Sequence, residues 1–290
     1  MIPNIIHFIF FVERKEYGGK PFSFIHFLSI YTAFKVHQPE RIYFHYQDEP
    51  TGEWWEKAKP YLTLNKVEAP TKIFGNELTH IAHKADVVRL EQLMRCGGIY
   101  LDIDVISVNS FEPLRENNAV MGIEHKVGLC SAVILSEKDG DFISIWYDQY
   151  KQFDGRKWNY HSVILPMKLA QQYPQFIHVE DQYAFFYPMH TDPSHLYLWT
   201  DSSKHDDLKH RLMNQHSSKH RLYRHHLIAG GAWQFTKLCQ SYCIHLWESL
   251  WFKAYLQNIT PDSVLFDNSN FSRLIRRVIT EAELLTMRSP

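Results

Sequence analysis

The sequence predicts an α/β protein in which helices cover a mostly parallel central sheet. Short apolar runs that are typical of strands alternate with longer segments of helical periodicity, and this alternation favours a parallel sheet. Hydrophobic residues make up 45% of the 290 residues and aromatic residues 15%, so the chain can bury a sizeable core. Length alone does not choose between one large domain and two smaller ones.

The expected elements follow one another along the whole chain. The first is a buried parallel strand over 4–12, where Ile5-Ile6-His7-Phe8-Ile9-Phe10 is almost continuously apolar. The other expected strands are 40–46, 62–68, 99–106, 119–124, 131–135 and 242–247. The expected helices are 22–37, 78–95, 139–153 and 160–173.

The helix expected over 78–95 carries two charged residues that need an explanation. Its apolar residues recur at helical spacing, and Gly97 is placed to end it. Asp86 and Arg89 are three residues apart and therefore share a face, where they can form a simple ion pair. Alternatively, this face lies over a ligand crevice, and the two side chains recognise a sugar hydroxyl and a phosphate.

The next strand ends in two carboxylates, Asp102 and Asp104, after the pair Gly97-Gly98. Residues i and i+2 of a strand lie on one side, and ligands of open α/β sheets gather beyond the carboxyl ends of the strands. Two carboxylates there can hold a hard divalent cation such as Mn²⁺ or Mg²⁺. A solvated strand end with two surface acids is the simpler alternative at this point.

Taken together, these residues resemble a known signature. The stretch from Ala85-Asp86-x-x-Arg89 through Gly97-Gly98-x-Tyr100-x-Asp102-x-Asp104 resembles the nucleotide-sugar signature of the DXD-containing glycosyltransferases with a GT-A fold. That family includes fungal α-1,6-mannosyltransferases, α-1,4-galactosyltransferases and the glucosylating domains of clostridial toxins. The resemblance implies a Rossmann-like, mostly parallel sheet with helical and loop additions toward the C-terminus.

Three other segments agree with this family. Ile2-Pro3-Asn4-Ile5-Ile6-His7-Phe8-Ile9-Phe10 is similar to its opening "IPKIIHxIW" strand, and Phe10 holds the place of the aromatic residue that stacks on the nucleobase. The stretch from Asp181 to Pro188 is like the later "FYP" strand. Tyr242-Cys243-Ile244-His245-Leu246-Trp247 resembles the "AVHxW" element, from which a histidine completes the metal shell in related enzymes.

The resemblance implies a role for each matching residue. The donor nucleotide sugar is expected to contact Ile9, Phe10, Asp86, Arg89, Tyr100 and Asp102. The residues expected to hold Mn²⁺ (or Mg²⁺) are Asp102, Asp104 and His245. The residues expected to act in catalysis are Asp86, Arg89, Asp102, Asp104 and Trp247. His226, before Ala229-Gly230-Gly231-Ala232-Trp233, and Glu248 with Ser249 remain alternatives for the third metal ligand.

The implied reaction is transfer of a sugar from a UDP- or GDP-sugar to a glycan, glycolipid or protein hydroxyl, with retention of configuration. An enzymatic alternative is a haloacid-dehalogenase-like phosphatase in which Asp102 is the nucleophile. A second alternative is a catalytically silent nucleotide-sugar-binding module. Because the formal charge is only -1 and the pI about 7.0, no nucleic-acid partner is expected.

We expect the catalytic domain to span 1–250, with a His-rich insertion at about 202–226, and a helical extension to cover 251–290. A short solvated insertion is favoured for the His-rich stretch, with zinc or an anionic membrane surface as the alternative. Ser272 to Ile279 reads as a basic amphipathic helix, which could pack on the domain or make peripheral membrane contact. Since no signal peptide or transmembrane segment is evident in the sequence, a cytoplasmic location is expected.

Overall fold

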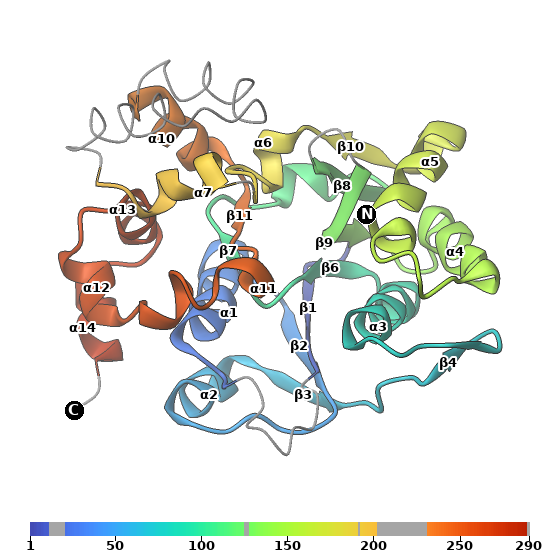
Figure 1. Cartoon of the computed structure of the whole chain (residues 1–290), viewed down its shortest axis with the longest axis horizontal. Coiled ribbons are helices and arrows are strands. Elements are labelled where there is room, and N and C mark those ends of the chain that lie inside the picture. Colours follow the sequence, from blue (N-terminus) through green and yellow to red (C-terminus); the bar gives the residue numbers. More distant parts are fainter. Residues whose placement is uncertain (12–20, 125–127, 191, 202–230, 289–290) are drawn as a thin grey trace.

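The computed structural model describes residues 1–11, 21–124, 128–190, 192–201 and 231–288. A seven-stranded sheet with the order β10-β8-β9-β6-β1-β2-β3 runs through the middle of the molecule (Figure 1). Its strands are β1 (Ile5–Phe10), β2 (Arg41–Tyr46), β3 (Thr63–Lys66), β6 (Gly98–Leu101), β8 (Ala119–Glu124), β9 (Gly128–Ser136) and β10 (His178–Glu180). All neighbours in this sheet are parallel except β9, which is antiparallel to β6 and β8. The predicted α/β class with a mostly parallel sheet is confirmed.

Helices cover both faces of this sheet. The α-helices within the described ranges are α1 (Phe24–His37), α2 (Glu53–Ala58), α3 (Ile81–Cys96), α4 (Asp141–Asp148), α5 (Leu165–Gln172), α6 (Gln182–Phe185), α7 (Asp192–Trp199), α10 (Gly231–Gln240), α11 (Glu248–Trp251), α12 (Pro261–Phe266), α13 (Asn270–Val278) and α14 (Glu281–Met287). Phe8 and Phe10 belong to a core cluster with α1, α13 and α14, whereas Ile9 belongs to a second cluster with α3, α4 and α5. Alternate residues of β1 therefore face the two opposite helical layers.

The Gly97-Gly98 pair lets α3 turn directly into β6. Both glycines have positive φ, at 63° and 115°. A Cβ on Gly98 would lie 2.4 Å from the Ile5 carbonyl oxygen, and one on Gly97 would lie 2.5 Å from the Lys138 backbone nitrogen. Only glycine fits these two close approaches, of Gly98 to β1 and of Gly97 to the segment after β9, so the pair fixes where the following Asp102 emerges.

The strand predicted over 99–106 is interrupted, which corrects the expectation of a continuous strand. β6 ends at Leu101, and β7 (Val105–Ser107) leaves the main sheet to pair antiparallel with β11 (Cys243–His245). The intervening residues form a turn in which the Val105 N–H donates to the Asp102 carbonyl at 3.0 Å. Asp102 and Asp104 thus lie in a turn, because the chain changes pairing partner between them.

Several other boundaries differ from the prediction. The strand expected within Asp181 to Pro188 is instead the helix α6, since the Asp181 carboxylate caps it by accepting from the Tyr183 N–H at 2.8 Å. The helix expected over 160–173 begins with a π-helical turn at Tyr160–Ile164 before α5. The helix expected over 139–153 is α4 followed by a 3-10 turn, and β9 begins three residues earlier than the predicted 131–135. A hairpin of β4 (Lys72–Ile73) and β5 (Asn76–Glu77) was not predicted.

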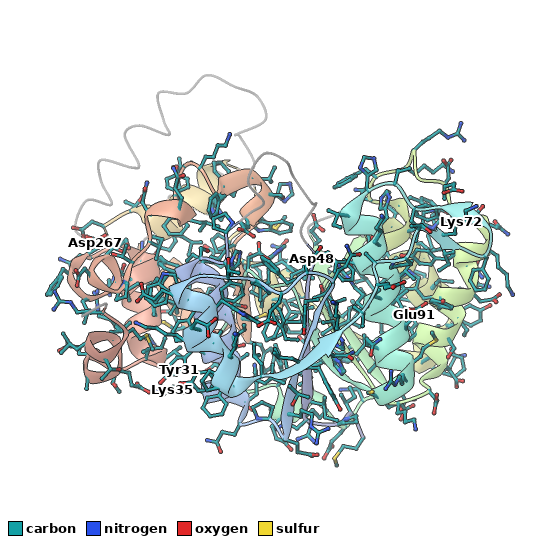
Figure 2. All side chains as sticks on the ribbon, turned by 90° about the horizontal axis from the view of Figure 1, so that it is seen from below. Tyr31, Lys35, Asp48, Lys72, Glu91 and Asp267 are labelled. Carbon is teal, nitrogen blue, oxygen red and sulfur yellow. The ribbon has the colours of Figure 1, made fainter. Side chains whose placement is uncertain are left out.

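The C-terminal helices contact α1 and α2. The helix predicted from Ser272 is confirmed as α13. Tyr31 and Lys35 on α1 point toward the C-terminal helices (Figure 2), where the Tyr31 hydroxyl donates to Glu283 at 2.8 Å and Lys35 forms an ion pair with the same carboxylate. The Lys57 ammonium donates to the Met287 carbonyl at 2.8 Å. The division at residue 250 stays a prediction.

Two expectations concern the rest of the chain. The His-rich stretch at about 202–226 lies outside the described residues. Among the helices in the described ranges, none combines the length and apolar character needed to cross a membrane.

Candidate active site

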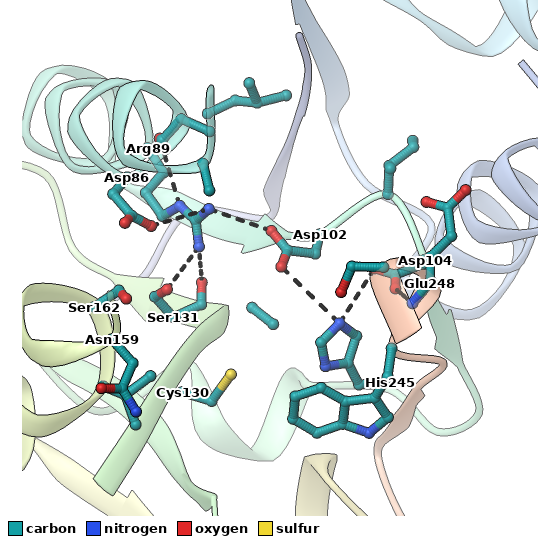
Figure 3. Close-up of a pocket in the computed structure, with 18 of the residues that line it drawn as sticks. Asp86, Arg89, Asp102, Asp104, Cys130, Ser131, Asn159, Ser162, His245 and Glu248 are labelled. Carbon is teal, nitrogen blue, oxygen red and sulfur yellow. Dashed lines mark hydrogen bonds and ion pairs between the residues drawn. The ribbon is translucent and has the colours of Figure 1, made fainter. Parts of the chain in front are cut away.

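A pocket of about 460 Å³ lies beyond the carboxyl ends of β1, β6 and β8. Its walls come from the turn between β6 and β7, the first half of α3, the start of β9, and the segment joining β11 to α11 (Figure 3). This is the edge of an α/β sheet at which ligands gather. Of the predicted site residues that the structure describes, all except Phe10 line this pocket.

Asp102, Asp104 and His245 form a group that can hold a metal ion. One ligand atom from each lies within 4.8 Å of the others. His245 Nε2 is 3.2 Å from Asp104 Oδ1 and 4.0 Å from Asp102 Oδ2. Two carboxylate oxygens and one imidazole nitrogen form a donor set that fits a hard or borderline divalent cation. The pairing of β11 with β7 sets His245 opposite Val105 and so brings the histidine to the turn.

The negative charge of this group acts on His245. Burial alone would lower the pKa of the imidazole, but the Asp104 and Asp102 carboxylates outweigh it and raise the pKa above the usual value. His245 Nδ1 is buried and has no hydrogen-bond partner among the described residues. The attraction that stabilises an imidazolium here would equally favour a bound cation.

The segment after His245 holds Asp104 in place. The Glu248 backbone N–H donates to Asp104 Oδ2 at 2.7 Å, and the Leu246 N–H donates to the Asp104 carbonyl at 3.1 Å. Trp247 adopts a left-handed conformation, with φ at 54°, and its ring centroid lies 4.1 Å from that of His245. The tight turn at Trp247 therefore fixes both the histidine and the carboxylate.

Asp86 and Arg89 lie on the α3 wall, and both are buried, with 6% of each residue exposed. Arg89 Nη2 is 3.2 Å from Asp86 Oδ1 and 3.5 Å from Asp102 Oδ1. Arg89 Nη1 donates to the backbone oxygen and the hydroxyl of Ser131, both at 2.7 Å. Asp86 and Arg89 therefore form the expected ion pair and also face the pocket, so the ion-pair and ligand-binding interpretations are compatible.

Tyr100 links Arg89 to Asp102. The Arg89 guanidinium lies 4.4 Å from the centroid of the Tyr100 ring, and the tyrosine hydroxyl donates to Asp102 Oδ1 at 2.5 Å. Burial raises the pKa of Asp86, although the Arg89 charge opposes the shift. The arginine is thus held by charge, by the Ser131 oxygens and by an aromatic face.

The expectation that Phe10 contacts the nucleobase is corrected by its placement. Phe10 is 4% exposed and packs against Phe22 and Phe44 in the core, with ring centroids 5.6 and 6.0 Å away. Strand alternation turns it toward α1, away from the pocket. Its neighbours Ile9 and Phe11 line the pocket instead.

The alternative metal ligands are placed as follows. Glu248 and Ser249 line the pocket, but the Glu248 carboxylate is buried against His26, whose Nε2 lies 3.0 Å from Glu248 Oε1. His226 lies outside the described residues, so its position is not compared with that of His245.

Sequence reasoning missed part of the pocket lining. The missed residues include Glu124, Cys130, Ser131, Trp158, Asn159, Ser162 and His190. Glu124 is the last residue of β8 and reaches within 3.9 Å of His190 Nδ1. A polar residue at the carboxyl end of a predicted parallel strand was the one signal that could have found Glu124. The others belong to segments that meet only in the folded chain.

Comparisons with known proteins identify the class of enzyme to which this α/β fold and its pocket belong. A family profile described as "Glycosyltransferase sugar-binding region containing DXD motif" matches residues 29–121. "Glucan organizing enzyme 1" of Cryptococcus neoformans var. grubii is 33% identical over 292 residues, which cover 96% of this chain and 71% of that protein. The protein is therefore a glycosyltransferase. The chain belongs to the family of glycosyltransferases with a DXD-containing sugar-binding region.

Solved structures of glycosyltransferases are also similar to this chain. The glycosyltransferase GlyE of Streptococcus pneumoniae has a TM-score of 0.45 and 12% identity, with 98% of this chain and 62% of that chain covered. The PaToxG glycosyltransferase has a TM-score of 0.41 and 21% identity, covering 59% and 69%. The galactosyltransferase LgtC, in complex with donor and acceptor sugar analogs, has a TM-score of 0.36 and 14% identity, covering 93% and 95%.

Proposed function

We propose that this glycosyltransferase takes its sugar from a UDP- or GDP-sugar, depends on Mn²⁺ or Mg²⁺, and transfers the sugar to a glycan hydroxyl with retention of configuration. The observation that carries this proposal is the convergence, in one pocket, of the Asp102, Asp104 and His245 group with the Asp86–Arg89 pair. One part suits a metal-bound diphosphate and the other suits a sugar ring.

Each residue has a defined part in this proposal. Asp102, Asp104 and His245 would hold the ion, which when bound supplies positive charge to offset the charge that develops on the departing diphosphate. Asp86 accepts hydrogen bonds from sugar hydroxyls, while Arg89, whose Nη1 already donates to Ser131, offers Nη2 and its positive charge to the sugar and the phosphate. The Trp247 indole nitrogen is buried without a hydrogen-bond partner among the described residues, which suits a donor to phosphate oxygen.

The remaining donor contacts follow from the lining of the pocket. Ile9 and Tyr100 supply apolar surface near the nucleoside, and Phe11 replaces Phe10 as the aromatic residue on this wall. An oxocarbenium-like transition state is expected, as in other glycosidic chemistry. Retention rests on the family resemblance, and front-face return within an ion pair requires no protein nucleophile.

The acceptor is proposed to be a glycan, with glucose-containing chains as the first to test. The name of the Cryptococcus relative refers to glucan, and the chain covers 71% of that protein. Glycolipid and protein hydroxyls are the other acceptors to include in the screen. Binding residues are often carried by loops, whose sequences vary more than that of the core, so the acceptor has to be found by experiment.

A panel of UDP- and GDP-sugars tests the proposal. Thermal denaturation of the purified chain with each donor, with MnCl₂ or with EDTA, should show stabilisation by at least one donor only when metal is present. At 100 times its dissociation constant, that donor should stabilise by about 2.7 kcal/mol. Slow metal-dependent hydrolysis of the same donor should accompany the shift. Cleavage of p-nitrophenyl phosphate would instead support the phosphatase alternative, and binding without turnover would support a silent binding module.

A further inference from the structure

The segment 158–162 forms a wall of the pocket that the proposed donor site does not use. Trp158, Asn159 and Ser162 all line the pocket. Figure 3 shows Asn159 and Ser162 across the pocket from His245. Within the described part of the chain, the side chains of Asn159 and Ser162 make no hydrogen bond. The segment therefore presents an amide and a hydroxyl without a hydrogen-bond partner in that part of the chain, beside the Trp158 ring, which contacts His80 and His83 at centroid distances of 5.5 and 5.4 Å and is still 62% exposed.

This wall is fixed from behind by its backbone. His83 Nε2 lies 3.1 Å from the Trp158 carbonyl oxygen, and the Trp146 indole nitrogen donates to the His161 carbonyl at 2.8 Å. His161 Nε2 in turn accepts from the Asp154 N–H at 3.1 Å. Because both histidines and Trp146 are buried, the segment is held before any ligand arrives, which lowers the entropic cost of binding.

Close packing with β9 adds to this rigidity. A Cβ on Gly128 would lie 2.2 Å from the Val163 carbonyl oxygen, so only glycine lets the start of β9 approach the segment. The contact falls in the π-helical turn Tyr160–Ile164, and such turns occur frequently at functional sites. The geometry of the wall is therefore built by β9, α3 and α4 together.

The exposed fractions of the lining residues indicate which substrate binds to this wall. The donor-orienting residues Asp86 and Arg89 on the α3 wall are 6% exposed, whereas Trp158 is 62% exposed and Leu250, also lining the pocket, is 59% exposed. A nucleotide sugar is enclosed on binding, but a glycan acceptor enters from solvent and leaves most of its chain outside. The exposed wall thus suits the acceptor.

The chemistry of the wall suits a pyranose ring. A sugar ring has an apolar C–H face, which can cover an indole, and equatorial hydroxyls, which need hydrogen-bonding partners at the edge. Resting on the function proposed above, we propose that Trp158, Asn159 and Ser162 form an acceptor subsite. Trp158 is the platform on which a pyranose ring of the acceptor glycan stacks, and Asn159 and Ser162 bind its hydroxyls.

A glycan array tests this subsite directly. Immobilised gluco-, galacto- and manno-oligosaccharides are probed with the full chain in the presence of UDP and MnCl₂. The variants are Trp158→Ala, Trp158→Phe and, as a matched control, Phe266→Ala, which removes a side chain from a residue that is 70% exposed on α12, outside the pocket lining. We expect Trp158→Ala to bind its glycans at least tenfold more weakly than the wild type, while Trp158→Phe and Phe266→Ala bind within about threefold of it, a difference of about 0.7 kcal/mol.

Two results would overturn the proposal. One is a wild-type protein that binds none of the arrayed glycans, and the other is Trp158→Ala binding as well as Phe266→Ala. The double variant Asn159→Ala with Ser162→Ala should also weaken glycan binding. All variants should stay folded and melt cooperatively, because hydrogen bonds to the backbone hold the segment, and Trp158→Ala should lose only the ring contacts with His80 and His83.

The same proteins separate this proposal from the proposed function. Metal-dependent stabilisation by a nucleotide sugar should be the same in Trp158→Ala and in the wild type, since the donor contacts are elsewhere. If no nucleotide sugar stabilises the wild type but glycan binding still requires Trp158, the proposed function fails and the subsite stands. If the donor binds but Trp158→Ala does not weaken glycan binding, only the subsite proposal is contradicted.

Discussion

The Asp104 carboxylate accepts a hydrogen bond from the Glu248 backbone N–H at 2.7 Å, although 144 residues separate the two in sequence. This bond ties the start of α11 to the turn between β6 and β7, and leaves the other carboxylate oxygen facing His245. Because the N–H belongs to the first turn of a helix, the carboxylate also satisfies a donor that has no partner within that helix. The metal-binding group is therefore assembled by long-range contacts from the C-terminal third of the chain.

Asp104→Asn should abolish metal-dependent donor binding and leave the fold intact. The asparagine oxygen can still accept from the Glu248 N–H, so the free energy of unfolding should fall by no more than about 1 kcal/mol. The charge that holds the cation is lost. Thermal denaturation with a nucleotide sugar and MnCl₂ measures the effect, with Asp262→Asn, on the exposed surface, as control. Unchanged turnover of the variant at saturating Mn²⁺ would remove Asp104 from the metal site.

Arg89→Lys should be damaging even though it keeps the charge. An ammonium cannot reproduce the fork that contacts Asp86, Asp102 and two oxygens of Ser131 at once. Since the site is buried, we expect a loss of about 1–3 kcal/mol in unfolding free energy and at least a tenfold loss in turnover. Urea denaturation and kinetics check both, with the exposed Arg156→Lys as control. If the unfolding free energy changes by less than about 0.5 kcal/mol and activity stays normal, the Asp86–Arg89 ion pair contributes as little as an exposed one and is not needed for the reaction.

His245→Ala should raise the Mn²⁺ concentration needed for half-maximal activity at least tenfold. Loss of one ligand of this kind corresponds to about 1.4 kcal/mol or more of metal binding. His226→Ala is the matched comparison and should leave the Mn²⁺ titration unchanged. If His245 is only a core histidine, its loss will lower thermal stability without moving the titration. A shifted titration in His226→Ala alone would reverse the assignment.

The parts of the site that could be predicted from sequence are those set by local spacing. Asp86 and Arg89 share a helix face, and the glycine pair and Asp102 follow within a few residues. Their relative positions depend on one helix, one turn and one strand. The break after Leu101 was missed, because it depends on pairing between β7 and β11, and these strands are distant in sequence.

The aromatic lining was predicted less well, for a physical reason. Phe8, Phe10 and Phe11 lie close together at the end of β1. Because this strand is apolar on both faces, the sequence does not show which of its residues face which helical layer. The motif placed Phe10 in the pocket, but the strand turns it to the core. Trp158 gave no signal, since its place in the pocket depends on α3, α4 and β9 meeting around it.

Glu283→Ala should loosen the contact of α14 with α1. The carboxylate completes a capping box with Thr280, accepts from the Tyr31 hydroxyl, and pairs with Lys35. Loss of these bonds at a partly exposed site should lower the unfolding free energy by about 1–2 kcal/mol. Thermal denaturation measures the change, and Glu281→Ala, in the first turn of the same helix, is the control. Equal melting temperatures for the two variants would show that the contact adds no stability.

Acid should destabilise the fold through His7 and His45, which form a buried chain of hydrogen bonds. His7 Nε2 is 3.0 Å from the Gly97 carbonyl, His7 Nδ1 is 3.1 Å from His45 Nε2, and the Asn65 amide nitrogen is 2.8 Å from His45 Nδ1. The carbonyl can only accept, so His7 carries its proton on Nε2 and accepts on Nδ1. His45 must then donate from Nε2 and accept from Asn65, and both rings are neutral.

The sign of the pH effect follows from these neutral rings. Burial lowers the pKa of His7 from 6.5 to about 4 and that of His45 to about 3. Between pH 6.5 and 4 the unfolded chain therefore binds more protons, so the stability present above pH 6.5 is lost as the pH falls. We expect a loss of about 2 kcal/mol for each histidine between pH 7.5 and 5. Urea denaturation at the two pH values should show His7→Gln losing less stability than the wild type, whereas His178→Gln, at an exposed histidine, should match the wild type. An equal loss in His7→Gln and the wild type would mean that folding leaves the pKa of His7 unchanged.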